Sequence, residues 1–214
     1  MKRSVVVLVT AALLFTGSIS ETLAQAYYHR TFYEGIDRFE LHYFPGGVTA
    51  GQAKKLTGGY AALPAGYYGY MKIGTVWRND IVGYTMIKGQ TLADYLKRYG
   101  RPVFAIRDQT IDIFGSFKSF LAADPTRYQY GREADYVARD KGRRTARTIL
   151  AKRGSEIHTI VMRGRDRDCR RRLKKNKLYQ KFVFLDGGAS LSPSARNPCY
   201  LVIRRGDLVA TFFD

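Results

Sequence analysis

Short apolar and alternating runs recur along the chain, and they predict a protein built mainly from β-strands. Residues that favour turns, chiefly Gly, Pro, Asn and Asp, separate many of these runs. We predict strands over residues 39–44, 70–77, 81–87, 103–106, 110–114, 145–151, 156–162, 182–185, 200–204 and 208–213.

Turn residues between neighbouring runs predict antiparallel hairpins. Arg78-Asn79-Asp80, Gly154-Ser155 and Gly206-Asp207 each separate two of the predicted strands. The runs 103–106 and 110–114 are also close enough in sequence to form a pair.

Helical spacing of apolar residues appears in two segments. Residues 92–99 show this spacing, Gly100 follows as a natural helix end, and Pro102 prevents continuation. In residues 166–177, Cys169 and Leu173 are one helical turn apart, which predicts a short helix.

The remaining pattern favours one domain. No repeat, low-complexity linker or obvious boundary interrupts the chain. Residues 122–142 are polar and weakly patterned, which predicts a long loop over one edge of the sheet. The class is therefore predicted to be α+β: a single domain with a mixed, mostly antiparallel sheet and a few packing helices.

One segment predicts a parallel strand pair. The strand 156–162, the helix 166–177 and the strand 182–185 follow one another, and such an order suits a helical crossover. Arg165 and Asp186 would then emerge at the same sheet edge, where ligands of such sheets are often bound. Taken alone, Asp186-Gly187 also suits an ordinary tight turn.

The first residues have the order of an export signal. Lys2 and Arg3 precede an almost wholly apolar stretch, residues 4–17, and the small-x-small site Ala24-Gln25-Ala26 follows. We predict a signal peptide over residues 1–26, cleavage after Ala26, and a mature domain over residues 27–214 that is secreted or periplasmic. An uncleaved anchor is the alternative, but a spanning helix needs about 20 apolar residues.

The charge of the chain predicts anionic partners. The full chain carries +18, and Lys2, Arg3 and Glu21 contribute +1 of this, so the mature part carries +17. Phosphates, acidic polysaccharides and phospholipid headgroups all suit such a charge. Export makes nucleic acid the least expected partner, and no further stretch predicts a transmembrane segment after cleavage of the signal.

The two cysteines, Cys169 and Cys199, suggest a disulfide. In an oxidising compartment a single pair of cysteines is a candidate bridge. The alternative is two buried free thiols. The histidines and cysteines do not have the spacing of a metal site, and we expect neither a metal nor a cofactor.

Residues 163–177 hold nine positive residues and two aspartates. Such a run is usually a solvated helix face. Its functional interpretation is a surface that docks on an anionic polymer.

Four short motifs follow one another along the chain: Thr57-Gly58-Gly59-Tyr60, Arg144-Thr145-Ala146, Gly164-Arg165 after a strand, and Asp186-Gly187-Gly188-Ala189-Ser190 at the end of a strand. They resemble, in the same order, the NGGFF, RTA, GR and LDGGGSS elements of the phosphodiester glycosidase family. The similarity spans roughly residues 39–203.

The resemblance implies roles for these residues. Asp186 would stabilise or trap the cationic sugar, and Arg144 and Arg165 would bind the phosphate. Thr57 and Ser190 would donate hydrogen bonds to the substrate. The glycines would form the floor of the site: Gly58, Gly59, Gly187 and Gly188.

Two functions follow from the sequence. The first is an exported hydrolase that cleaves a sugar-1-phosphodiester at its glycosidic bond, which the retained Asp186, Arg144 and Arg165 favour. The second is a non-catalytic binder of anionic glycan or cell-envelope polymer on the same fold. Thr57 in place of Asn and Ala189 in place of Gly favour the binder.

Overall fold

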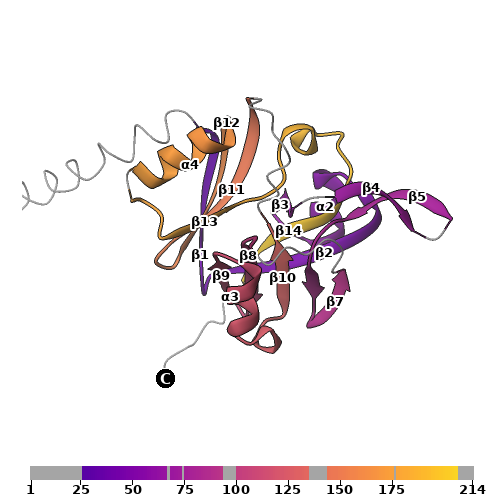
Figure 1. Ribbon diagram of the computed structural model, residues 1–214, viewed down its shortest axis with the longest axis horizontal. Helices are drawn as coiled ribbons and strands as arrows, with labels where there is room; N and C mark the ends of the chain where they lie inside the picture. Colours follow the sequence, from indigo (N-terminus) through magenta and orange to yellow (C-terminus); the bar gives the residue numbers. More distant parts are fainter. Residues whose placement is uncertain are drawn as a thin grey trace, which may run out of the picture.

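The computed structural model describes residues 26–66, 68–73, 75–93, 100–134, 144–175 and 177–206. Within these residues the chain forms three open sheets, a separate hairpin and three α-helices (Figure 1). All the strand pairings found there are antiparallel. The predicted α+β class, with mostly antiparallel strands and a few packing helices, is confirmed.

The sheets contain the following strands. The four-stranded sheet has the order β1 (Ala26–Tyr33), β12 (Glu156–Gly164), β11 (Thr145–Arg153) and β13 (Lys181–Phe184). The five-stranded sheet has the order β7 (Gln90–Ala93), β6 (Thr85–Ile87), β10 (Tyr130–Glu133), β8 (Val103–Arg107) and β9 (Thr110–Phe114). The three-stranded sheet has the order β2 (Asp37–Val48), β14 (Asn197–Arg205) and β3 (Ala61–Pro64), and β4 (Tyr68–Ile73) pairs with β5 (Val76–Ile81).

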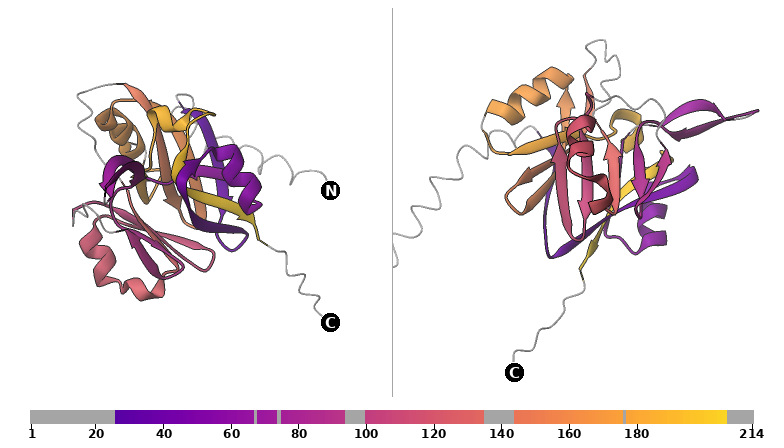
Figure 2. Two further views of the ribbon diagram at one scale, coloured as in Figure 1. Left: turned by 90° about the vertical axis from the view of Figure 1, so that its right-hand side faces the viewer. Right: turned by 60° about the horizontal axis from the view of Figure 1, so that its bottom comes forward.

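Each of the three sheets carries one helix on its outer side (Figures 1 and 2). The helix α4 (Asp166–Lys175) packs on the four-stranded sheet, α3 (Phe117–Ala122) on the five-stranded sheet, and α2 (Ala50–Thr57) on the three-stranded sheet. The inner faces of all three sheets share one central hydrophobic core.

The strand β8 shows why these strands are apolar on both faces. Phe104 and Ile106 point into the central core, whereas Val103 and Ala105 pack in the cluster that contains α3. A strand buried on both faces gives an almost continuous apolar run instead of a clear alternation. This is the run that the sequence shows at residues 103–106.

The predicted parallel pair is wrong in one respect. The strand β11 lies between β12 and β13 and is antiparallel to both, so β12 and β13 run in the same direction but do not pair with each other. The tight hairpin at Gly154-Ser155 makes β11 the neighbour of β12, and the free edge of β11 then takes β13. The carboxyl ends of β12 and β13 still lie at the same end of the sheet.

Other local predictions need correction. The turn of the β4–β5 hairpin lies between Ile73 and Val76, which pair with each other, and not at Arg78-Asn79-Asp80. Asp80 instead lies in β5, where its buried carboxylate accepts hydrogen bonds from Tyr43 Oη at 2.9 Å and from the Ile81 N–H at 2.8 Å. Polar residues that predict a turn can therefore belong to a strand when the core supplies donors.

Two further segments differ from expectation. The predicted loop 122–142 contains a 3₁₀ turn, Pro125–Arg127, and the strand β10 at the centre of the five-stranded sheet, while residues 135–143 lie outside the described residues. The start of the predicted helix 92–99 belongs to β7, and residues 94–99 lie outside the description.

Predictions at the two chain ends stay open. Residues 1–25 of the predicted signal peptide and residues 208–213 of the predicted last hairpin lie outside the described residues. Within the described residues, the strand β14 pairs with β2 on one side and with β3 on the other. No helix among the described residues is long and apolar enough to cross a membrane.

The predicted disulfide is wrong, because Cys169 and Cys199 are both free and buried. Cys169 belongs to the cluster between α4 and its sheet, whereas Cys199 belongs to the central core on the other side. Burial raises the pKa of the Cys199 thiol to about 11 and also raises the pKa of Cys169. The alternative interpretation of two buried thiols is the one the structure has.

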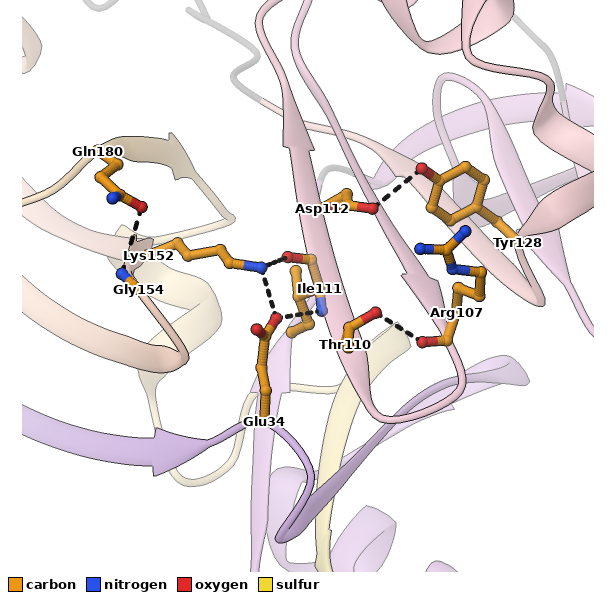
Figure 3. A network of polar contacts seen from close by, with 9 residues as sticks. All are labelled: Glu34, Arg107, Thr110, Ile111, Asp112, Tyr128, Lys152, Gly154 and Gln180. Atoms are coloured by element: carbon orange, nitrogen blue, oxygen red, sulfur yellow. Dashed lines mark hydrogen bonds and ion pairs between the residues drawn. The ribbon is translucent and has the colours of Figure 1, made fainter.

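Polar contacts join the sheets at the end where the β11–β12 hairpin turns (Figure 3). We call this the hairpin end of the four-stranded sheet. Lys152 Nζ donates to Glu34 Oε1 at 2.6 Å and to the Ile111 carbonyl at 2.8 Å. The same Glu34 oxygen accepts the Ile111 N–H at 2.8 Å. These bonds tie β11, the β1–β2 turn and β9 together.

Candidate functional site

The opposite end of the four-stranded sheet holds three of the four motifs singled out in the sequence, those that contain Arg144, Arg165 and Asp186. We call it the loop end, because β13 continues there into the Asp186 loop, while β12 passes through Arg165 into α4. Thr145 pairs with Gly164 on one side of β11, and Gly187 lies beside Ala146 on the other. Neighbouring strands lie about 4.8 Å apart. By these registers Arg165 is level with Arg144 and Asp186 with Arg147, so their backbones are two strand spacings apart across the sheet and three residues apart along it, or roughly 14 Å in all.

Two glycines at the loop end are fixed by close packing. A Cβ at Gly187 would lie 2.5 Å from the Ala146 carbonyl oxygen, and a Cβ at Gly164 would lie 2.9 Å from Cys169 Sγ. The Gly187 contact is with backbone, which cannot move aside as a side chain can. Gly187 is thus required for the loop to cross β11 closely.

Asp186 is buried at this end with only 6% of its surface exposed. Its Oδ1 accepts the Gly187 N–H at 2.8 Å, and its Oδ2 accepts the Ser190 hydroxyl at 2.6 Å. Burial raises the pKa of Asp186, while these two hydrogen bonds and the charge of Arg132 oppose the rise. The carboxylate is therefore desolvated and held in one orientation.

The Ser190 side of the loop is anchored to the three-stranded sheet. Ser190 ends the Asp186 loop in a 3₁₀ turn, Gly188–Leu191. Asn197 Nδ2 donates to the Ser190 carbonyl at 3.2 Å and to Tyr200 Oη at 3.0 Å, and Tyr200 Oη donates to the Val48 carbonyl at 2.9 Å. Asn197 Oδ1 is buried and has no hydrogen-bond partner among the described residues.

Arg132 is a site residue that the sequence analysis missed. It is fully buried and lies near enough to Asp186 for their charges to interact. Its Nε donates to the Ala65 carbonyl at 2.7 Å, and its Nη1 donates to the Val82 carbonyl at 2.8 Å and to Thr85 Oγ1 at 2.7 Å. A guanidinium so held is a fixed positive charge inside the core.

Glycines leave the space that Arg132 and its neighbour Glu133 occupy. Gly66 has a φ of 88°, and a Cβ there would lie 3.0 Å from Arg132 Nε. Gly83 has a φ of 86°, and a Cβ there would lie 3.1 Å from Glu133 Oε2. Glu133 Oε1 in turn lies 3.5 Å from Arg101 Nε. Positive φ and close approach together require glycine at both positions.

A sequence signal for this region was present. Tyr128, Tyr130 and Arg132 alternate with Gln129 and Gly131, which is the period of a strand. The flanking polar residues hid the pattern within a predicted loop. Interpreted as a strand, the segment would have placed an arginine on the same face as a core tyrosine.

The two predicted arginines lie at the loop end. Arg144 is exposed and directly precedes β11, and Arg165 directly follows β12. Arg165 is partly buried, and its Nε is buried without a hydrogen-bond partner among the described residues. The structure thus brings Arg144, Arg165 and the Asp186-Gly187-Gly188 turn to one end of one sheet.

The predicted Thr57-Gly58-Gly59 floor lies elsewhere. Thr57 ends α2 and donates its hydroxyl to the Ala53 carbonyl at 2.8 Å, and Gly58 caps the helix with a φ of 69°. Gly59 packs on Val202, at the end of β3 far from Arg132. The other end of β3 leads into Ala65 and Gly66, which lie against Cys199 and Arg132. The turn at Ala65-Gly66, and not the one at Gly58-Gly59, therefore lies against Arg132.

Among the described residues, no group of three or more His, Cys, Asp or Glu side chains is arranged to hold a metal ion. The chemistry of the loop end consists of one desolvated carboxylate, fixed arginines and hydroxyl or amide groups.

Comparison with known proteins gives structural similarity without a match in sequence. No family model matches the chain, and no curated protein matches its sequence. The chain is similar in structure to the zebrafish N-acetylglucosamine-1-phosphodiester α-N-acetylglucosaminidase catalytic domain, solved in a form auto-inhibited by its pro-peptide, with a TM-score of 0.57 and 12% identity. The match covers 84% of this chain and 83% of that chain. It shows a shared fold.

Proposed function

We propose that this protein is an exported hydrolase that cleaves a sugar-1-phosphodiester at the bond between the anomeric carbon and the phosphate oxygen. The observation that carries the proposal is the buried Asp186 carboxylate, held by Gly187 and Ser190 at the sheet end where Arg144 and Arg165 also lie. The shared fold with a phosphodiester glycosidase catalytic domain supports it.

The chemistry needs few groups. Cleavage of the anomeric C–O bond builds positive charge on the sugar and leaves a phosphate monoester, while water supplies the new anomeric hydroxyl. Asp186 stabilises or traps the cationic sugar, as carboxylates do in other glycosidases. Because Asp186 is desolvated, its charge acts on the transition state more strongly than it would in water.

Arginines take the part of a general acid in this proposal. A phosphate is a good leaving group, so neutralising its charge is more useful than protonating it. A guanidinium pairs with phosphate through two parallel hydrogen bonds and keeps its proton. Arg165, whose buried Nε has no partner among the described residues, is the residue best placed for this role, with Arg144 beside it.

A product assay in ¹⁸O-labelled water tests the proposal. Small sugar-1-phosphodiesters, beginning with methyl esters of N-acetylglucosamine 1-phosphate and glucose 1-phosphate, would be incubated with the mature protein. We expect the free sugar to carry the label and the phosphate monoester to carry none. Label on phosphate would mean a phosphodiesterase that cuts the P–O bond, and the proposed reaction would be wrong.

The absence of turnover on a broad panel would favour the alternative, a non-catalytic binder of anionic glycan. The Thr57-Gly58-Gly59 turn supports this alternative, because it lies outside the loop end instead of forming its floor. Binding of the same compounds, measured by calorimetry and lost in an Arg165→Gln variant, would then identify the loop end as a binding site only.

A further inference from the structure

The helix α4 has two chemically different faces. Cys169 and Leu173 are buried against the four-stranded sheet, and every other residue of the helix is charged. Arg170 also lies on the inner side, where its guanidinium sits 4.5 Å above the ring of Phe184. The helix is therefore held to the sheet by a narrow apolar strip, and its outer face is free for another purpose.

The outer face carries a line of cations that we call the cationic stripe. It consists of Arg167, Arg171, Lys174 and Lys175. Arg167, Arg171 and Lys175 follow one another at intervals of four residues, and Lys174 comes three residues after Arg171, so all four lie on one side of the helix. The Arg167 side chain is 70% exposed, and the other three residues are exposed as well. Eight residues at 1.5 Å each give the stripe a length of about 12 Å.

Little of this charge is neutralised within the protein. The two carboxylates of α4 lie in its first turn, where Asp166 pairs with Arg170 at 2.8 Å and Asp168 lies 3.7 Å from Arg167. Within the described part of the chain, Arg171, Lys174 and Lys175 pair with no carboxylate. The stripe beyond the first turn is thus available to an external polyanion.

The position of the stripe connects it with the candidate site. Helix α4 starts directly after Arg165, so the stripe begins at the loop end and runs away from it over the outside of the sheet (Figures 1 and 2). Arginines at the site and cations along the stripe form one sequence of positive groups along the chain. A linear ligand held in the site can continue along the helix.

We infer that the cationic stripe binds neighbouring phosphodiester groups of a polymeric substrate, a glycan whose sugars are joined through phosphodiesters, while one glycosidic bond lies at Asp186. This inference rests on the proposed hydrolase function and names its substrate as a polymer. Each contact between a phosphate and a cation releases counterions, which favours binding, so a row of phosphates suits a row of cations. Arginine also pairs with a phosphate group through two parallel hydrogen bonds.

A lipid surface fits the stripe less well. Helices that lie on membranes expose large apolar side chains that enter the acyl boundary. In α4, Cys169 and Leu173 are buried and the outer face is wholly charged, and no exposed large hydrophobic residue of the described chain belongs to this helix. The stripe therefore suits a soluble polyanion better than a bilayer.

A matched pair of triple variants tests the inference. Arg171→Gln/Lys174→Gln/Lys175→Gln removes three charges from the stripe, and Lys54→Gln/Lys55→Gln/Lys118→Gln removes three from the exposed surfaces of α2 and α3. Binding of poly(N-acetylglucosamine 1-phosphate) would be measured in an Asp186→Asn background, which prevents turnover. We expect the stripe variant to bind roughly ten- to hundredfold more weakly, with a shallower salt dependence, and the control to change less than threefold.

Each other outcome overturns the inference. Equal weakening in both triple variants would mean attraction by net charge alone. Tighter binding of phosphatidylglycerol vesicles, or equally tight binding of polygalacturonate, would mean a different partner. If the stripe triple variant does not fold, the single Arg171→Gln variant is compared with Lys118→Gln by the same assay.

Small substrates separate this inference from the proposed function. The stripe variant should cleave a methyl sugar-1-phosphodiester with unchanged kcat/KM but cleave the polymer with a raised KM. A wild type that cleaves neither compound, yet binds the polymer through the stripe, would refute the hydrolase and leave the docking surface standing. If the wild type cleaves both the small substrate and the polymer, and the stripe variant has an unchanged KM for the polymer, only the docking surface would be refuted.

Discussion

The two ends of the four-stranded sheet use buried polar residues in different ways. At the hairpin end, Glu34 and Lys152 bond to each other and to the same backbone residue, Ile111 (Figure 3). At the loop end, Arg165 Nε and Asn197 Oδ1 are buried without hydrogen-bond partners among the described residues. Buried polar groups in proteins are usually satisfied, so those that are not call for an explanation.

A pair of aspartates shows the contrast within one residue type. Asp37, near the hairpin end, and Asp186, at the loop end, are each 6% exposed. Asp37 accepts the Tyr33 N–H at 2.7 Å and the Tyr60 hydroxyl at 2.6 Å, and Asp186 likewise accepts one N–H and one hydroxyl. Burial and contacts alone therefore do not distinguish a functional carboxylate from a structural one.

The surroundings make the difference. The partners of Asp37 join the β1–β2 turn to Tyr60, which is a purely structural task. Asp186 lies instead in a glycine-rich loop near the buried Arg132, at the same end of the sheet as an Arg165 nitrogen that lacks a hydrogen-bond partner among the described residues. The comparison shows that nearby buried polar groups without hydrogen-bond partners indicate a functional site more clearly than the buried carboxylate itself does.

The largest expected effect comes from the matched substitutions Asp186→Asn and Asp37→Asn. If the proposed function holds, Asp186→Asn should lower kcat by at least about 10³-fold, or about 4 kcal/mol in activation free energy, because the lost charge acts mainly in the transition state. Asp37→Asn should leave kcat within twofold. Equal turnover by wild type and Asp186→Asn would remove the distinction between the two ends.

Stability should respond in the opposite sense. Burial raises the pKa of Asp186 above its unfolded value, so its ionised form weakens folding at every pH above that value. Asp186→Asn should therefore melt at or above the wild-type temperature, whereas Asp37→Asn should lose about 1 kcal/mol of unfolding free energy. Thermal unfolding at pH 7 checks both.

The next effect concerns Arg132. Arg132→Met should lower the free energy of unfolding by about 3–5 kcal/mol, because it removes the donors of three buried acceptors and leaves Asp186 and Glu133 without their nearest buried cation. Urea unfolding followed by fluorescence measures this. A loss below 1 kcal/mol would show that the loop end is not held together by this arginine.

At the hairpin end the expected effect is smaller and purely structural. Glu34→Gln should cost about 1–2 kcal/mol, because Lys152 keeps its bond to the Ile111 carbonyl but loses its ion pair. Turnover of a small substrate should not change. A variant with normal stability but reduced kcat would place function at the wrong end of the sheet.

The sequence predicted most of the strands whose apolar runs are long. The β11–β12 hairpin, with its Gly154-Ser155 turn, and the pair β8–β9 were confirmed. The strands β1, β3, β7 and β10 were missed. Strands β3, β7 and β10 have four residues each, which give little periodicity, and in β1 the polar residues His29 and Arg30 interrupt the aromatic run. Neighbours in space, such as β11 between β12 and β13, depend on hairpin closure and are not fixed by order along the chain.

The candidate site was predicted in part for a similar reason. Residues next to strand ends, such as Arg165 and Asp186, could be placed together because strand direction determines which end they occupy. Arg132 could not, because its position depends on β10 entering the middle of another sheet. Thr57 was assigned from motif similarity, and the capped end of α2 holds it away from the loop end.

The smallest expected effect concerns a histidine pair at the hairpin end. His158 Nε2 lies 3.1 Å from Glu156 Oε2, and its Nδ1 lies 3.0 Å from His29 Nε2 and 3.2 Å from Thr31 Oγ1. A neutral His158 can donate from Nε2 and accept at Nδ1, which suits all these contacts. A second proton on Nδ1 would point at the N–H of His29.

Burial lowers the pKa of His158 and of His29, and the charge of Arg153 lowers both further. The charge of Glu156 raises both pKa values and only partly offsets this. A histidine whose folded pKa lies below its unfolded value, near 6.5, contributes stability that is fully present above that pH and is lost as the pH falls through it. We therefore expect the urea midpoint to fall between pH 7.5 and pH 5.5, and the fall to shrink in His158→Gln. His42→Gln is the control, since His42 lies on β2 and bonds to Glu40 instead. Two results would contradict this: a wild-type urea midpoint that is constant over this range, or a His42→Gln variant that removes the fall as fully as His158→Gln. Either result would mean that the stability of the hairpin end does not depend on a neutral His29–His158 pair. The polar groups of the hairpin end would then be no better satisfied than those of the loop end.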